Sequence, residues 1–467
     1  MAEPTQAFNP KKLGELQSRI LFTVGVLLVY RLGTIVPTPG INPDAMRGYL
    51  ELTFGTQGSI VTLFNLFSGG ALESFSVFAL GIMPYVTASI IMQLMGEIVP
   101  QIKENQREGE VGRQKNNQYT RYLSVALCAV QATVIASSLQ GAVAPGGIPV
   151  VREPGILFVA TAVLSLTTGS IFVMWMGEQV TRSGIGNGIS LIIFAGIVTS
   201  IPGAAGGFIQ QINQETINPI GAIMIGIIIV GSLVGIVFIE QAERRIPVQY
   251  PGRMMGRRQM QGVKSHLPLK LNPSNVIPPI FASSLLVFLP TVSGLTQDIT
   301  VNPEGGAIER FWESVVVHVV RPMGEALNPS EWLYSVVFGV LIVAFAFFYT
   351  SIIFNPDEMA ENIKRNGGFV PGIRPGSMTA NFIRPIMNRL TLIGGVYLVI
   401  ICAILPYALS RGTGVTFYFG GTSVLICVGV ALDTFRHIAD HLRNTKYDAL
   451  LEGKALGKIK GRRRSAA

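Results

Sequence analysis

The chain has 467 residues, of which 49% are hydrophobic and only 13% are charged, and its mean hydropathy is +0.46. Since an average soluble protein carries about 25% charged residues, this composition excludes an ordinary soluble domain and indicates an integral membrane protein. The formal net charge is +9, so the positions of the basic residues are informative.

Ten apolar runs are candidates for membrane spans. Hydrocarbon about 30 Å thick requires roughly 20 apolar residues in a helix, because every backbone amide must be bonded internally there. In chain order the runs are residues 20–37, 75–95, 122–141, 155–176, 187–202, 219–240, 275–292, 332–354, 390–410 and 416–433. The sequence therefore predicts an all-α membrane protein with ten transmembrane helices.

The basic residues predict the orientation of these spans. Of the 36 Lys and Arg residues, 30 fall in alternate connections and in the two tails, and cytoplasmic loops are the ones that retain positive charge. Residues 1–19 and 434–467 are therefore predicted to be cytoplasmic tails. The first run is long enough to span and follows no cleavable leader pattern, so we expect it to remain as an anchor.

Two of the runs share a local pattern 194 positions apart, in "GIMPYVTASII" (81–91) and "VIPPIFASSLL" (276–286). The matched pairs are Pro84 with Pro278, Val86 with Ile280, Ala88 with Ala282 and Ser89 with Ser283. This short match indicates two related halves, and related halves in a membrane protein usually enclose a path or a site.

Ionisable residues are missing from the predicted midplane of the spans; Arg31, Glu240 and Asp433 stand at span ends. Proton pumps and many ion-coupled carriers need such groups there. The "HIADH" stretch (437–441) has two histidines four apart but an aspartate where zinc peptidases have glutamate, and no third ligand. "SGIGNGIS" (183–190) favours a tight helix start over a nucleotide loop. We therefore expect no enzyme activity, no cofactor and no metal.

Two other features need an explanation. Residues 60–72 form an apolar stretch too short to cross, ended by Gly69 and Gly70, which either lies on the surface or dips back between helices. The long basic loops 241–274 and 355–389 are the second feature. In the latter, two Pro-Gly turns flank Arg374, which suggests a docking site, although positive charge that merely sets topology is the simpler alternative.

Five motifs resemble the SecY family of protein-conducting channels, over about residues 10–440. They are "FNLFSGGALESFSVFALGIMPYVTASIIMQL", "GEQVTRSGIGNGISLIIFAGI", "HLPLKLNPSNVIPPIFASS", "GGFVPGIRPG" and "FYFGGTSVLI". The resemblance implies ten helices in two inverted halves of five, residues 20–202 and 203–433, around a central pore. It also implies a subunit of the bacterial inner (plasma) membrane translocon with SecE and SecG as partners. Unfolded preproteins would be the substrates, driven by the SecA ATPase or a ribosome.

The same resemblance assigns roles to individual residues. The implied hydrophobic pore ring is Ile82, Val86, Ile189, Ile193, Ile280 and Ile426. The implied plug, within residues 60–72, includes Leu63, Phe64, Leu66, Phe67, Gly69 and Gly70. A lateral gate into lipid would carry Gln93 and Asn272 at the cytoplasmic ends of spans 2 and 7. The basic residues that would meet SecA or ribosomal RNA are Arg253, Arg257, Arg258 and Arg374.

Some of these assignments have independent support in spacing, because Ile82 and Val86, like Ile189 and Ile193, are four apart and face one way on a helix. Two other classes of protein stay open: a small-solute transporter built from inverted repeats, and a membrane scaffold without a pore. A transporter is expected to bring polar groups together at the midplane.

Overall fold

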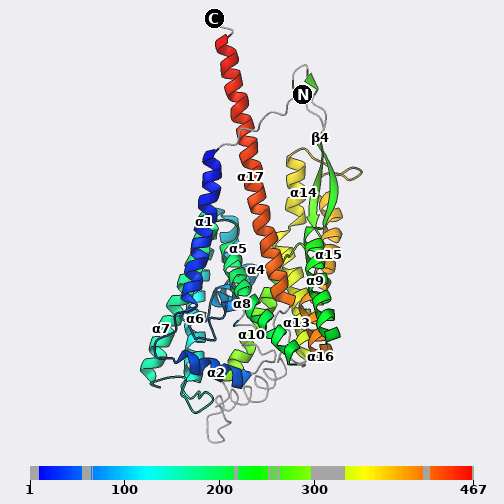
Figure 1. Ribbon diagram of the computed structural model, residues 1–467. Helices are drawn as coiled ribbons and strands as arrows, with labels where there is room; N and C mark the ends of the chain where they lie inside the picture. The colour runs from blue at the N-terminus through cyan, green and yellow to red at the C-terminus, as the bar shows by residue number, and fades with distance from the viewer. Residues whose placement is uncertain are drawn as a thin grey trace.

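The computed structural model shows a tall bundle of long helices (Figure 1). The residues that the structure describes are 10–54, 65, 67–214, 219–250, 254–255, 258–259, 263–295, 332–413 and 421–464. The start of α1 (Pro10–Gly33), the end of α17 (Gly421–Arg464) and the strand β4 (Val263–Lys270) lie toward the same end of the bundle. This end is the one that the basic residues predict to be cytoplasmic.

The helices that the structure describes in the first part of the chain are α1, α2 (Pro43–Phe54), α4 (Met83–Ile98), α5 (Pro100–Arg107), α6 (Glu110–Leu139), α7 (Ile156–Ser183) and α8 (Gly188–Asn213). Three of them, α1, α2 and α5, begin at a proline. A proline in the first turn costs no hydrogen bond, since the first amides of a helix have no partner within it. Helix α6 packs against α4 and α7, and α7 also packs against α8.

The second part continues the bundle. Its helices are α9 (Pro219–Gln241), α10 (Ile277–Leu295), α13 (Trp332–Ile353), α14 (Pro356–Arg365), α15 (Ser377–Val399), the π-helical turn η2 (Ile400–Ile404), α16 (Leu405–Thr413) and α17. The widened turn η2 lies directly before Pro406, which has no N–H to donate to the carbonyl of Cys402. The chain therefore passes from α15 to α16 without a break.

A β-ribbon corrects the expectation of an all-α fold. β1 (Glu243–Tyr250) pairs antiparallel with β4, from Glu243 opposite Lys270 to Tyr250 opposite Val263, and β2 (Met254–Met255) pairs with β3 (Arg258–Gln259). Ile246 and Val248 are buried, while Arg245 and Pro247 beside them are exposed. This period of two is the pattern of a half-buried strand.

Eight helices in the described part of the chain are long and apolar enough to cross a membrane. The predicted runs 75–95 and 275–292 correspond to α4 and α10, of which α4 has only 16 residues and the apolar stretch of α10 runs over Ile277–Leu286. Sixteen residues extend a helix by about 24 Å, less than the hydrocarbon thickness. The chain is therefore a mostly helical membrane protein with eight candidate spans.

One predicted helix start is wrong. The run 75–95 begins with turns rather than a helix, because Phe75 and Gly81 have φ angles of 43° and 53° and α4 starts only at Met83. Beyond the last predicted span, which ends at 433, α17 continues as one helix to Arg464. Apolar runs indicate which residues are buried, whereas good helix formers in water continue a helix beyond them.

The buried apolar side chains form three clusters. A central cluster joins α4, α7, α8, α10, α13 and α17, and a second lies between α2, α6 and α7. A third packs the ribbon against α14 and α15 and has Ile246, Leu269, Val370, Ile383, Met387 and Leu390 as buried members.

Candidate functional site

The six side chains expected to form a ring all belong to the central cluster. Four of them are buried and two are half-buried against it; in order they are Ile82, Val86, Ile193 and Ile426, then Ile189 and Ile280. They come from four segments of the chain, at the start of α4, α8 and α10 and near the start of α17. The cluster has many other members, so burial alone does not separate a ring from ordinary packing.

The start of α8 positions two of these residues. Asn187 precedes the helix, and its Oδ1 accepts from the amides of Ile189 at 3.1 Å and Ser190 at 3.5 Å. A Cβ on Gly188 would lie 2.0 Å from the carbonyl oxygen of Gly177, so α8 can press against α7 only with glycine there. The prediction of a tight helix start at "SGIGNGIS" is confirmed.

The expected plug lies partly outside the described residues, which exclude Leu63, Phe64 and Leu66. Phe67 is 3% exposed and belongs to the central cluster with the ring candidates. Gly69 and Gly70 have φ angles of 69° and 83°, in the region that favours glycine. The two glycines therefore turn the chain immediately after Phe67.

Helices α1 and α8 hold this turn from two sides. Tyr30 donates from its hydroxyl to the carbonyl oxygen of Ser68 at 3.1 Å, and Arg31 donates from Nη1 to that of Gly69 at 2.9 Å. On the other side, a Cβ on Gly69 would lie 3.0 Å from the Cα of Gly196 in α8. The end of the apolar stretch 60–72 is thus buried between helices rather than laid on the surface.

The two gate candidates, Gln93 and Asn272, form hydrogen bonds with other residues and not with each other. Gln93 is half-buried and donates from Nε2 to Ser89 Oγ on its own helix at 3.3 Å. Asn272 is 1% exposed and donates from Nδ2 to Glu240 Oε1 at 2.7 Å. In the sequence, Glu240 was only a residue at a span end; a contact between residues 32 positions apart leaves no local signal.

Arg374 is exposed and lies between two turns, as the sequence predicts. Gly372 and Gly376 have φ angles of 81° and 104°, and the carbonyl oxygen of Arg374 accepts from Thr379 Oγ1 at 3.0 Å. The backbone is thereby fixed on both sides of the arginine, while its guanidinium projects from the fold.

The ribbon and the Arg374 loop form one body, which we call the platform: β1, β4, α14, residues 366–376 and the start of α15. Gln249 in β1 and Phe369 exchange two backbone hydrogen bonds, of 2.8 and 2.9 Å. The third apolar cluster fills the space beneath them. Arg258 lies in β3 at the far end of the ribbon, and Arg253 and Arg257 lie outside the described residues.

An ion pair that the sequence did not reveal joins α6 to α7. Arg121 donates from Nε to Glu178 Oε1 at 2.8 Å and from Nη2 to Glu178 Oε2. A paired fork of this kind fixes geometry as well as charge. It joins the first half of α6 to the last turns of α7.

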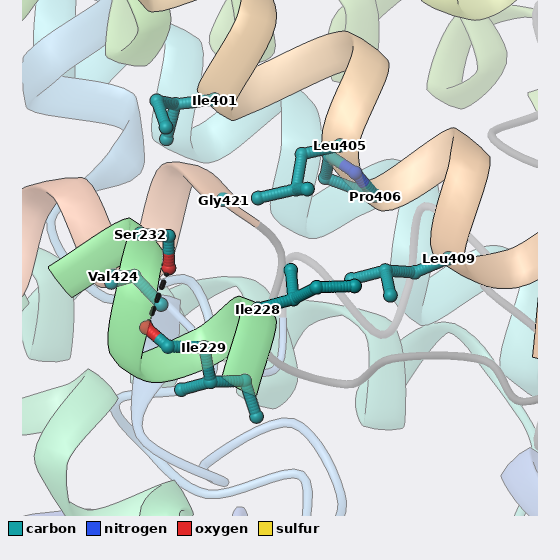
Figure 2. Close-up of a pocket in the computed structure, with 9 residues that line it drawn as sticks. All are labelled: Ile228, Ile229, Ser232, Ile401, Leu405, Pro406, Leu409, Gly421 and Val424. Carbon is teal, nitrogen blue, oxygen red and sulfur yellow. Dashed lines mark hydrogen bonds between the residues drawn. The ribbon is translucent and has the colours of Figure 1, made fainter. Parts of the chain in front are cut away.

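A small pocket between α9, η2, α16 and α17 shows little that could recognise a polar solute (Figure 2). Its lining is aliphatic apart from Ser232, whose hydroxyl donates to the carbonyl oxygen of Ile229 at 2.8 Å on its own helix. The hydroxyl is therefore already occupied. This pocket lacks the converging polar groups of a solute site.

Comparison with known proteins identifies the family. The SecY profile matches residues 76–435. The chain belongs to the SecY family. A SecY translocase subunit of Aquifex aeolicus is 42% identical over 437 residues, covering 93% of this chain and 96% of the relative. That of Escherichia coli K12 is 42% identical over 440 residues, covering 94% and 95%. SecY proteins are non-enzymatic transport channels, so the alternative of a scaffold without a pore is set aside.

Solved structures support the fold. One comes from a study in which the SecY plug domain stabilises the closed state of the translocation channel and maintains a membrane seal; it has a TM-score of 0.61 at 19% identity and covers 95% of both chains. The second is Sec61 in a canine ribosome-channel complex, with a TM-score of 0.57 at 19% identity and 95% coverage of both chains. The bundle therefore has the SecY channel fold.

Proposed function

We propose that this SecY-family chain is the central channel subunit of a bacterial plasma-membrane translocon, with both termini cytoplasmic. We further propose that α4 and α10 complete a set of ten transmembrane helices in two inverted halves, residues 20–202 and 203–433. The uneven distribution of basic residues supports the orientation. The similarity to bacterial SecY subunits of similar length supports the assignment to a bacterial plasma membrane.

The observation that carries the proposal is the shared cluster of six aliphatic side chains from four helices, two helices from each half. A collar of such side chains excludes water and ions when it is closed. It also offers a passing peptide no fixed hydrogen-bond partner, so it accepts unfolded chains of any sequence. Ring residues would be Ile82, Val86, Ile189, Ile193, Ile280 and Ile426.

The neighbouring elements suit the remaining parts of such a channel. The stretch 60–72 is the proposed plug, and its buried end beside Phe67 lies against the collar. The contact of α4 with α10 is the proposed lateral gate, through which transmembrane segments would pass into lipid. Asn272 and Gln93 stand near its platform-side end.

The platform is the proposed docking surface for SecA or a ribosome. Exposed Arg374 offers a planar cation to carboxylates or RNA phosphates, and Arg253, Arg257 and Arg258, which fall between β1 and β4 in the sequence, are proposed to add to it. A structural relative in a ribosome-channel complex supports the ribosome as a partner. SecE and SecG are proposed as small membrane subunits of the same complex.

Translocation into vesicles tests this function. The chain is purified from native membranes with its small helical partners, reconstituted, and supplied with SecA, ATP and a preprotein. We expect protease-protected preprotein in the vesicles only when ATP is present. Saturable uptake of a small solute by the chain alone, without any protected preprotein, would favour the transporter alternative instead.

A further inference from the structure

A buried carboxylate, Glu240, lies at the joint between the platform and α10. Glu240 is 5% exposed and stands one residue before the end of α9, while Asn272 is 1% exposed and follows β4 by two residues. The two strands of the ribbon thus lead directly into α9 and toward α10. Leu271 donates its amide to the carbonyl oxygen of Ala242 at 2.9 Å and closes the base of the ribbon above them.

The turn between the ribbon and α10 is held by hydrogen bonds from two helices. Asn272 donates from Nδ2 to Glu240 Oε1 at 2.7 Å and to the carbonyl oxygen of Asn275 at 3.0 Å. Ser274 donates to Asn272 Oδ1 at 3.0 Å, and Asn275 donates from Nδ2 to Asp433 Oδ2 of α17 at 3.0 Å. Both N–H groups of the Asn272 amide therefore donate, and its oxygen accepts from Ser274.

The packing leaves this turn little room to shift while it is bonded. Asn275 has a φ angle of 54°, a conformation that asparagine tolerates better than most residues. A Cβ on Gly394 of α15 would lie 3.2 Å from the Cα of Asn272, and one on Gly429 of α17 would lie 2.4 Å from Val276. Arg436 of α17 also donates to the carbonyl oxygen of Glu240 at 3.2 Å.

We propose that Glu240 is a positioning residue for α10, which acts through Asn272 to hold the platform-side end of that helix on α9 and α17. The inference rests on the proposed function, in which α10 separates from α4 when the channel opens to lipid. A carboxylate that accepts a hydrogen bond in a buried site forms a strong, directional contact. Without the hydrogen bond between Glu240 and Asn272, a force on the ribbon moves the start of α10 more easily.

The test uses the full chain with its partner subunits in vesicles, with Cys128, Cys402 and Cys427 replaced and one cysteine pair placed across the α4–α10 contact. Disulfide yield without SecA reports the closed contact, and export of a preprotein with a defective signal reports ease of opening. For Glu240→Ala we expect the yield to fall, and the export to rise, at least threefold. Glu240→Gln retains the acceptor oxygen and should change both much less.

A swap of the two partners separates positioning from general damage. Asn272→Asp places two carboxylates together and should loosen α10 as Glu240→Ala does. Adding Glu240→Gln to it reverses the direction of the hydrogen bond and should restore both readouts in part, because a carboxylate at position 272 cannot replace the second donation, to the carbonyl oxygen of Asn275. Thr350→Val is the matched control, because Thr350 is buried in α13 and its hydroxyl has no partner.

Unchanged readouts in Glu240→Ala would overturn the proposal. So would a swap that fails to restore them even in part, or a Thr350→Val variant that shifts them equally. If Glu240→Ala does not fold, the swap and Glu240→Gln decide the question alone. The unaltered protein tests the proposed function independently of these variants. If it exports no preprotein with SecA and ATP, the proposed function is wrong.

Discussion

The proposed collar is most directly tested at Ile426, which is 1% exposed in the central cluster. Burying an isoleucine side chain stabilises a structure by roughly 1.5 to 3 kcal/mol, and Ile426→Asn removes much of this from the closed state. The new amide also needs hydrogen-bond partners that an aliphatic cluster does not offer. Each shift of about 1.4 kcal/mol raises a rare open state tenfold, so we expect the open population to rise about ten- to a hundredfold.

Single-channel conductance in planar bilayers measures this change, with export of a preprotein that carries a defective signal as the second readout. Both should increase for Ile426→Asn. The control, Ile426→Leu, keeps volume and apolarity and should cost less than about 1.5 kcal/mol. If the Asn variant unfolds at a lower temperature but stays as tight to ions as the Leu variant, Ile426 is ordinary packing and does not belong to the collar.

Three further predictions concern the platform, the gate and the plug. Arg374→Glu should lower preprotein translocation at least tenfold with saturating SecA and ATP, whereas Arg152→Glu, the same charge reversal at an exposed residue between α6 and α7 and outside the platform, should leave it normal; a normal rate for Arg374→Glu refutes docking there. An oxidised cysteine pair across α4 and α10 should block export until it is reduced, so undiminished export would exclude gate opening as a required step. Gly196→Ala places a Cβ 3.0 Å from the carbonyl oxygen of Phe67 and should raise ion leak, while Gly203→Ala meets nothing within 4 Å; equal leak from both would remove the plug contact.

Local patterns in the sequence predicted a large part of the site. The glycines of residues 183–190 start a helix and two Pro-Gly turns flank Arg374, as expected, whereas Pro84, expected inside a span, stands in the first turn of α4. Each of these features depends on backbone geometry within a few residues. The ring candidates also gather in one cluster, although their role in a pore stays a prediction.

The contacts that the sequence did not reveal are polar and distant. Glu240 and Asn272 are 32 positions apart, Arg121 and Glu178 are 57 apart, and Asn275 and Asp433 are 158 apart. Each residue by itself resembles an ordinary polar group at a helix end. The β-ribbon was missed for another reason, because its short alternation is interrupted by prolines and basic residues that favour a loop.

The kinds of contact within and between the two proposed halves differ in a way that bears on opening. The hydrogen bonds and ion pairs described above each join elements of one half: Arg121 to Glu178 in the first, and Asn272 to Glu240 in the second. The central cluster, by contrast, joins the halves through aliphatic side chains. Hydrogen bonds are directional, whereas apolar contacts depend mainly on area and can be replaced by those of a passing hydrophobic segment.

Under the proposed function, this difference would make α10 the helix on which opening depends. Its aliphatic side faces α4 in the other half, and the turn before it is tied to α9 and α17 by polar bonds. When the halves separate, the apolar contact gives way first, because an incoming apolar segment can replace it, while the tether at Asn272 keeps α10 with its own half. The strength of that tether relative to the apolar contact would therefore determine whether α4 and α10 separate along their whole contact at once or first at the platform-side end.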